Sequence, residues 1–387
     1  MKYWRGYLVA AICAAISGAL VSFAKAHSVL VDMVYPYMTR LIINTLAEMN
    51  AGGGVVWQGL LLTLIILAVI TIVLMILFKW NPIQVIGWFL AVVSTISLFN
   101  TALYGLNAYT SPIADDMRLE ITDYTVAELN EATVYFRDKA IELAAQAKRD
   151  GNGDVDFGTF EEMADQAGDG FKNLTYQDAI SVFAGSTVPV KKQGWFRSKG
   201  DSGITVALTG EACVNPKVPT VSMPFAMCKE MAHRMTIYSD ADANFAAFLA
   251  ASRNSSPEFQ YSAYLMAYYF CIHSLESIPT STAKACASQT RSGESHLLKG
   301  DLADAAEFYD HAKETRNQEH NLKDINGDNP EDATDVVTFS SYSSSTDLFA
   351  SWYIQHYILP EHREEEAPFD PLDPTQVDLT GTAAAGG

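Results

Sequence analysis

A run of 24 residues without a charged side chain constrains this chain more than any other feature. It extends from Val55 to Phe78 and contains a single glutamine, Gln58. A helix rises ~1.5 Å per residue, so the run is long enough to cross the ~30 Å hydrocarbon core of a bilayer. It ends at Lys79 and Trp80, a cation and an aromatic ring suited to the headgroup region. The chain is therefore predicted to be an integral membrane protein.

Two further hydrophobic runs accompany this one. Asn81-Pro82 predicts a short turn, and the run from Ile86 to Leu103 is interspersed with small and polar residues, which is typical of a span that packs on another helix. These features predict a helical hairpin of residues 55–78 and 86–103. The run from Tyr7 to Phe23 is shorter and Ala-rich.

The segment after Phe23, Ala24-Lys25-Ala26, resembles a signal-peptidase site, so the first run is either a cleaved signal peptide or a retained helix. We favour retention, because the later spans already mark a membrane protein. Leu30 to Met49 is amphipathic and interrupted by Pro36, and is expected at the membrane interface.

The basic residues predict the orientation. Lys2, Arg5 and Lys79 fall on one side of the membrane if there are three spans, and basic loops favour the cytoplasm. The remaining chain then lies outside the cytoplasm. Arg40 and Lys25 on the opposite side oppose this assignment.

Charge is distributed unevenly along the chain. Residues 1–110 carry a balance of +3, whereas the remainder carries −22, which together give the net −19. Such an acidic domain would repel nucleic acid and anionic lipid, so no nucleic-acid partner is expected. The sequence predicts a lipid bilayer and an unidentified peptide or membrane protein as partners.

The five cysteines leave two readings open. Cys213, Cys228, Cys271 and Cys286 lie in the acidic part and could form two disulfides in an oxidising compartment or remain buried thiols. They contain no C-x-x-C pair, so a cysteine zinc site is not expected.

The rest of the chain is predicted to be mainly helical with a few short strands. Residues 1–106 form the membrane region, 107–363 a globular domain and 364–387 a disordered tail. Residues 185–220 are rich in Gly, Pro, Val and Thr and predict loops and short strands. Hydrophobic periodicity and composition predict helices at Thr125–Lys148, Phe160–Ala167, Ser222–Ala251, Gln260–Leu275, Leu297–Gln318 and Asp347–Leu359.

One helical segment carries a degenerate metal-binding motif. In H-E-x-x-H, the two histidines share a helix face and bind zinc, and the glutamate acts on the zinc-bound water. Here Glu230 and His233 are in place, but Lys229 stands at the first ligand position. By itself, such a match is weakly specific.

The flanking stretches resemble the domain-of-unknown-function 3810 family, a bacterial family of polytopic proteins regarded as zincin-like. The resemblance extends from about Phe99 to Tyr353, most of the chain. It is carried by the order and spacing of the stretches beginning Tyr104-Gly105-Leu106, Thr209-Gly210-Glu211, Met223-Pro224-Phe225, Asp240-Ala241-Asp242, Phe259-Gln260-Tyr261, Leu322-Lys323-Asp324, Ser341-Tyr342 and Asp347-Leu348.

The resemblance implies a zincin-like fold, with zinc as cofactor in active relatives. It places Glu230 as the catalytic base, and His233 with Asp242 or Asp240 as metal ligands. The family has Glu where Asp240 and Asp242 stand, and Asp is one methylene shorter. A protonated Lys229 cannot donate a lone pair to zinc, but it can replace the ion by pairing with these carboxylates.

Three functions follow from the implied site. The favoured one is a membrane-anchored, catalytically silent zincin-like protein that has lost zinc and acts by binding. The alternatives are an active zinc endopeptidase with a rearranged ligand set, and a structural or assembly subunit.

Three other side chains are possible site residues. Tyr261 and Tyr342 are candidate hydrogen-bond donors to an oxyanion, although aromatic packing is the favoured role for each. Glu211 either lines the cleft or caps backbone donors.

An acidic loop offers a second, separate metal site. Asp150, Asn152, Asp154, Asp156 and Glu161 resemble an EF-hand calcium loop, but either alignment register lacks a required residue. The alternative is a polar connection between two helices.

Overall fold

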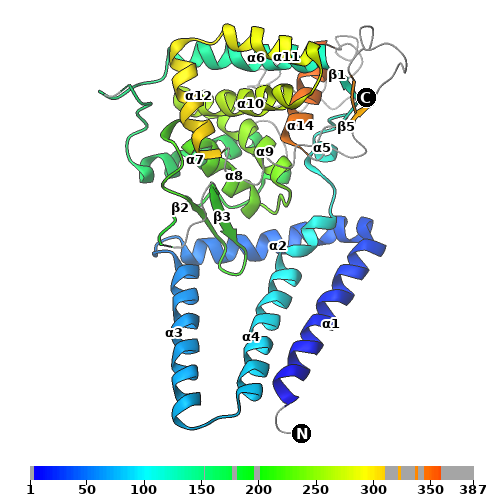
Figure 1. Ribbon diagram of the computed structural model, residues 1–387, viewed down its shortest axis with the longest axis vertical. Coiled ribbons are helices and arrows are strands. Elements are labelled where there is room, and N and C mark those ends of the chain that lie inside the picture. Colours follow the sequence, from blue (N-terminus) through cyan, green and yellow to red (C-terminus); the bar gives the residue numbers. More distant parts are fainter. Residues whose placement is uncertain are drawn as a thin grey trace.

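The computed structural model describes the chain in seven ranges, namely 4–151, 153–176, 181–195, 201–309, 321–323, 336–338 and 344–358. Figure 1 shows long helices at one end, a mostly helical domain at the other, and one helix lying crosswise between them. The predicted disordered tail and Tyr342 lie outside the described ranges.

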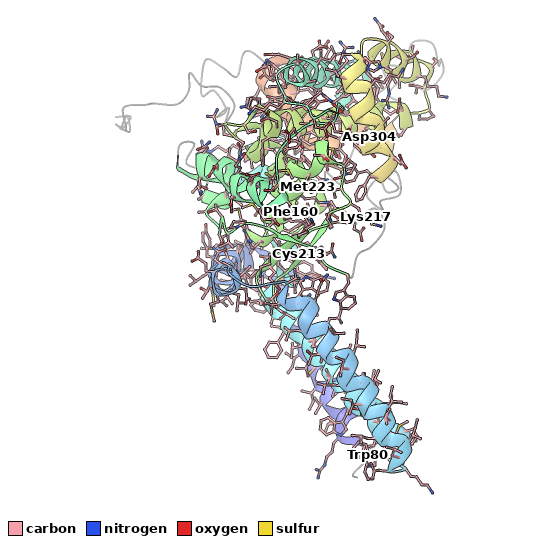
Figure 2. The ribbon with its side chains drawn as sticks, turned by 90° about the vertical axis from the view of Figure 1, so that its left-hand side faces the viewer. Trp80, Phe160, Cys213, Lys217, Met223 and Asp304 are labelled. Atoms are coloured by element: carbon pink, nitrogen blue, oxygen red, sulfur yellow. The ribbon has the colours of Figure 1, made fainter. Side chains whose placement is uncertain are left out.

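Three helices in the described ranges are long and apolar enough to cross a membrane, which confirms the predicted runs. They are α1 (Arg5–Ala26), α3 (Val56–Leu77) and α4 (Pro82–Leu103). Asn81 caps α4 by accepting a hydrogen bond from the Ile83 N–H, and Pro82 occupies the first turn, where its missing N–H costs nothing. Figure 2 shows Trp80 at the end of these helices far from the domain.

The packing of the apolar helices differs from the predicted hairpin. α4 packs along α1 over much of its length, whereas α3 diverges from α4 (Figure 1). The contact is close because Gly6 and Gly87 face each other, and a β-carbon at either position would overlap the other helix. Small residues let two helix backbones approach closely and make extensive van der Waals contact. The bulky side chains of α3 do not allow so close an approach.

α2 (Ser28–Asn50) is the crosswise helix, and Pro36 lies inside it without ending it. Its buried residues include Val31, Ile43 and Ala47, which face the rest of the protein. Asp32 holds the chain after α4, because its carboxylate accepts hydrogen bonds from the N–H and hydroxyl of Ser111, each at 2.7 Å.

The domain is built around α10 (Pro257–Ser277), which contacts α6, α8, α9, α11 and α14. The helices are α5 (Ile113–Asp116), α6 (Val126–Ala144), α7 (Phe160–Tyr176), α8 (Met223–Arg234), α9 (Asp240–Ser252), α11 (Ser281–Ser292), α12 (His296–Tyr309) and α14 (Ser345–Tyr353). Single turns are η2 (Gly105–Tyr109), η3 (Ser181–Phe183), η4 (Thr220–Ser222) and η5 (Ile354–Ile358). The domain is mainly helical, as predicted.

In the described residues, six short strands form two small sheets. β2 (Lys191–Lys192), β4 (Glu211–Val214) and β3 (Gly203–Val206) lie in that order, with β3 antiparallel to β4 and at the edge of this sheet. The other sheet has the order β1 (Tyr124–Thr125), β6 (Val336–Thr338), β5 (Asn321–Lys323) and is antiparallel. The short strands predicted within 185–220 are those of the first sheet.

One predicted helix is two helices. The segment Ser222–Ala251 breaks between α8 and α9, where Thr236 adopts a φ of 76° and Ile237 N–H bonds back to the Ala232 carbonyl. A β-branched residue seldom adopts a positive φ, so composition gave no signal for this break. Ser239 then caps α9 by accepting from the Asp242 N–H at 3.0 Å.

Other boundaries also differ. α7 is longer than predicted, and α12 is described only to Tyr309.

All five cysteines are free thiols, so the two disulfides that the sequence left open are not formed. Cys213, Cys228 and Cys271 are fully buried, consistent with the alternative role as small apolar core residues.

Candidate functional site

α8 and the start of α9 bring the degenerate motif together. Lys229 and His233 are four residues apart, so they lie on one face of α8. The turn between the helices returns the chain so that Asp240, the first residue of α9, faces them. The order of secondary structure therefore places a cation, an imidazole and a carboxylate at one point.

A single carboxylate oxygen joins these three side chains. Asp240 Oδ1 lies 3.0 Å from Lys229 Nζ and 3.3 Å from His233 Nε2. The Lys229 side chain is 4% exposed, whereas that of Asp240 is 58% exposed. Solvent therefore screens the carboxylate while the ammonium is largely removed from water. Partial loss of hydration opposes ionisation of Asp240, but its contacts with His233 and Lys229 outweigh this and hold its pKa well below the ordinary range.

His233 is held in one orientation. Its Nδ1 lies 2.9 Å from the Ile237 carbonyl oxygen, which can only accept, so Nδ1 carries a proton and Nε2 faces Asp240. Burial by itself would lower the pKa of His233, but the hydrogen bond to Asp240 and the Glu230 charge outweigh it, so the pKa is raised.

Glu230 lies beside β3. The Thr205 hydroxyl donates toward the carbonyl oxygen of Glu230 at 2.9 Å and toward its Oε2 at 3.0 Å. A β-carbon on Gly203 would lie 2.6 Å from the Glu230 Cγ, so only glycine permits this approach of strand and helix. Burial raises the pKa of the Glu230 carboxyl, and the charges of His233 and Lys229 oppose the increase.

These residues line an open pocket of about 430 Å³. Its walls come from the end of α4, from β3 and the residues before it, from α8 and from the α8–α9 turn. The lining residues are Tyr104, Asp201, Ser202, Gly203, Ile204, Thr205, Lys229, Glu230, His233, Tyr238 and Asp240. Tyr104, Thr205 and Tyr238 were not predicted as site residues, because only the fold brings them to α8.

Two predicted site residues lie elsewhere. Asp242 lies within a different pocket beside α2, and its carboxylate accepts a hydrogen bond from the Ser239 hydroxyl at 2.7 Å. The Tyr261 hydroxyl donates to Asp301 at 2.5 Å inside the core, where Arg149 also binds that carboxylate. Neither Asp242 nor Tyr261 lines the pocket around Lys229, and their roles as a metal ligand and an oxyanion donor stay predictions.

Glu211 has the capping role that the sequence left open. Its two carboxylate oxygens accept hydrogen bonds from the N–H groups of Val56 and Trp57, each at 2.8 Å, in the first turn of α3. Lys191 Nζ lies 2.8 Å from the same side chain and also donates to the Gly54 carbonyl. The domain therefore neutralises the positive end of an apolar helix with a buried carboxylate.

Comparison with known proteins decides the family. A profile described as "Protein of unknown function (DUF3810)" matches residues 31–326, about three quarters of the chain. The chain belongs to this family. The match begins inside α2, at Val31, and includes α3, α4 and the whole pocket. No curated protein matches the chain, and no solved structure does.

The sequence resemblance predicts zinc at this site, so the fit of zinc to the residues of the pocket can be tested. Among the described residues, no group of three or more His, Cys, Asp or Glu side chains is arranged to hold a metal ion. Lys229 Nζ lies against the Asp240 carboxylate, which a bound metal ion would need as a ligand. An ammonium offers no lone pair, so these side chains do not fit zinc as a ligand set.

The acidic loop of this DUF3810 protein forms a tight turn. Arg149 pairs with Val155 as an isolated bridge, and Asp150 accepts a hydrogen bond from the Asp154 N–H at 3.1 Å. The Asp156 carboxylate accepts from the Gly158 N–H at 3.0 Å, and Glu161 lies in the first turn of α7. Asn152 lies outside the described residues. Calcium binding at this loop stays a prediction, and the loop geometry agrees equally with a polar connection.

Proposed function

We propose that this chain is a membrane-anchored, zincin-like protein of the DUF3810 family that is catalytically silent and acts by binding. Its partner would be a peptide or a membrane protein. The observation that carries the proposal is Asp240 Oδ1, which contacts both Lys229 Nζ and His233 Nε2. A lysine therefore supplies the positive charge in a place where the family resemblance implies a metal.

Electrostatics supports a lysine as a permanent replacement. Glu230 is 3% exposed, and a buried carboxylate is costly unless a cation lies nearby. Lys229 provides that cation from the same helix and does not dissociate as a metal ion does. The same charge repels a divalent cation, so the arrangement opposes zinc uptake.

The pocket supports binding over a purely structural role. It is lined by charged and hydroxyl side chains and not filled by apolar ones. β3 forms one wall and is the edge strand of its sheet. An edge strand offers backbone N–H and C=O groups that an extended peptide can pair with.

Several observations support a multi-pass arrangement with the domain outside the cytoplasm. The start of α1 at Arg5 and the turn between α3 and α4, which contains Lys79, lie at the same end of the apolar helices (Figure 1). Basic residues there favour the cytoplasmic side. Arg40, which opposed this orientation in the sequence, is buried and bonds to the Met235 and Ser181 carbonyls, so it is not a loop charge. The close α1–α4 contact supports retention of α1.

Zinc content tests the proposal directly. The purified protein would be equilibrated with zinc, passed through gel filtration and analysed by inductively coupled plasma mass spectrometry. We expect the natural protein to hold no stoichiometric zinc and Lys229→His to hold about one ion, because His at 229 and 233 with Asp240 makes three ligands. Lys284→His on exposed α11 is the matched control and should hold none.

Two results would contradict this proposal. One zinc in the natural protein would show that the lysine does not replace the metal, and peptide hydrolysis would then be assayed. No zinc in Lys229→His would remove support for the zincin resemblance itself.

A further inference from the structure

We infer that the pocket receives a juxtamembrane segment of another membrane protein, bound in an extended conformation. The inference rests on the proposed binding function and adds the class and location of the partner. It follows from how the pocket is connected to the apolar helices.

The pocket begins where an apolar helix ends. Tyr104 is the C-cap residue of α4, and its N–H donates to the Asn100 carbonyl at 2.9 Å. The same Tyr104 lines the pocket, and its ring packs against that of Tyr238 with centroids 5.5 Å apart. If α4 crosses the bilayer, the pocket lies at the membrane surface and not at the far end of the domain.

α2 gives a second marker of that surface. One face packs on the protein, whereas the opposite face exposes large apolar side chains at helical spacing. These are Val29, Leu30, Met33, Val34, Tyr37, Met38, Leu41, Ile42 and Met49. An apolar face of this kind on a helix crosswise to the membrane helices is typical of an interfacial helix, with its exposed face in the acyl boundary.

The pocket cannot move far from α2, because both of its sides are attached there. The turn after β3 reaches α2, where Asn50 Nδ2 donates to the Thr209 carbonyl at 2.7 Å and Gly210 leaves no space for a β-carbon. On the other side, Arg40 donates to the Met235 carbonyl at 3.2 Å, directly before the α8–α9 turn. α2 therefore holds the strand and the helix of the pocket against one surface.

The walls favour an extended partner. β3 supplies a strand edge. The pocket also contains three carboxyl groups, those of Asp201, Glu230 and Asp240, and one ammonium group, that of Lys229. A strand paired to β3 would present alternate side chains to these polar groups. A segment directly adjoining a membrane helix reaches this position without leaving the bilayer surface, whereas a soluble peptide must bind from dilute solution.

The test uses photocrosslinking in the full-length protein reconstituted into nanodiscs. p-Benzoylphenylalanine would be placed at Asp201, which is exposed and lines the pocket, and at exposed Gln289 on α11 as the control. The probes are three libraries of randomised segments of about 8 residues. One is joined directly to an apolar helix of about 20 residues, one is joined through roughly 40 Gly/Ser residues, and one is soluble.

We expect crosslinks at Asp201 but not at Gln289, with yields about tenfold higher for directly joined segments than for spaced ones. Equal yields from all three libraries would overturn the juxtamembrane inference and leave the proposed binding function intact. Crosslinks to lipid alone would also overturn it and identify a headgroup as the occupant. No crosslink to any library at Asp201 would contradict the binding function itself.

Discussion

Gly6 on α1 and Gly87 on α4 lie in direct contact, with no room between the two helices for a β-carbon on either residue. A β-carbon on Gly87 would lie 2.7 Å from the Tyr7 ring, whose hydroxyl donates to the Ile83 carbonyl at 2.9 Å. This crossing joins the first apolar helix to the third, and α3 takes no part in it. Small residues at the α1–α4 contact, and not adjacency in the chain, therefore decide which apolar helices pack together.

Gly87→Leu should destabilise the protein, because the larger side chain must push α1 away from α4. Overpacking of this kind costs about 1–3 kcal/mol or more. Thermal unfolding in detergent would measure the loss. Gly18→Leu on α1 is the control, since no described atom beyond its own stretch of α1 lies within 4 Å of its β-carbon position, and it should be nearly neutral. Equal melting temperatures for the two variants would contradict the described crossing.

Glu211→Gln should destabilise the junction between the domain and α3. The substitution keeps the shape but removes the carboxylate that pairs with Lys191 and weakens two hydrogen bonds to the N–H groups of α3. Removing one member of a buried pair costs about 3 kcal/mol or more. Denaturant unfolding would measure it, with Glu307→Gln on the exposed side of α12 as the control. A loss no greater than that of the control would show that Glu211 is dispensable.

Acid should weaken the same junction. Burial opposes ionisation of Glu211, but its bonds with Lys191, Val56 and Trp57 outweigh burial, so its pKa is lowered. A group with a lowered native pKa stabilises the fold fully above its ordinary pKa and loses this contribution as the pH falls through the native value. Natural protein should therefore lose more stability below about pH 4.5 than Glu211→Gln does. Parallel pH profiles would contradict this linkage.

Lys229 and Asp240 should be energetically coupled. A double-mutant cycle with Lys229→Met and Asp240→Asn would measure their interaction in the free energy of unfolding. We expect about 0.5–2 kcal/mol, because the lysine is buried whereas 58% of the Asp240 side chain is exposed to screening solvent. Coupling within error of zero would show that the ion pair does not form in solution.

The exposed face of α2 should enter the bilayer. Nitroxide labels on cysteines at Met38 and Leu41 in reconstituted protein should be accessible to oxygen and protected from a polar nickel reagent. A label at Gln289 on α11 should show the reverse. The apolar face should lie about 5–10 Å inside the headgroup boundary. Nickel accessibility at Leu41 equal to that at Gln289 would place α2 in water.

Much of this arrangement follows from local sequence. The charge-free run at 55–78 must be a helix in lipid, since every backbone polar group there needs an internal partner. Periodicity likewise predicted α6, and composition predicted α10; the apolar residues of both lie in the core. The order of the helices in the chain did not predict that α4 packs against α1, because a Gly–Gly crossing depends on how two distant helices rotate.

The sequence alone determined the apolar helices, the mainly helical domain and the presence of Lys229 where the motif has histidine. Those properties depend on residue type and on spacing along one helix. Only the tertiary structure decided that Asp240 and not Asp242 faces Lys229, and that Tyr261 lies in the core. The α8–α9 turn, with Thr236 at positive φ, sets which face of α9 meets α8. That choice depends on contacts between segments far apart in the chain, such as Arg40 with Met235.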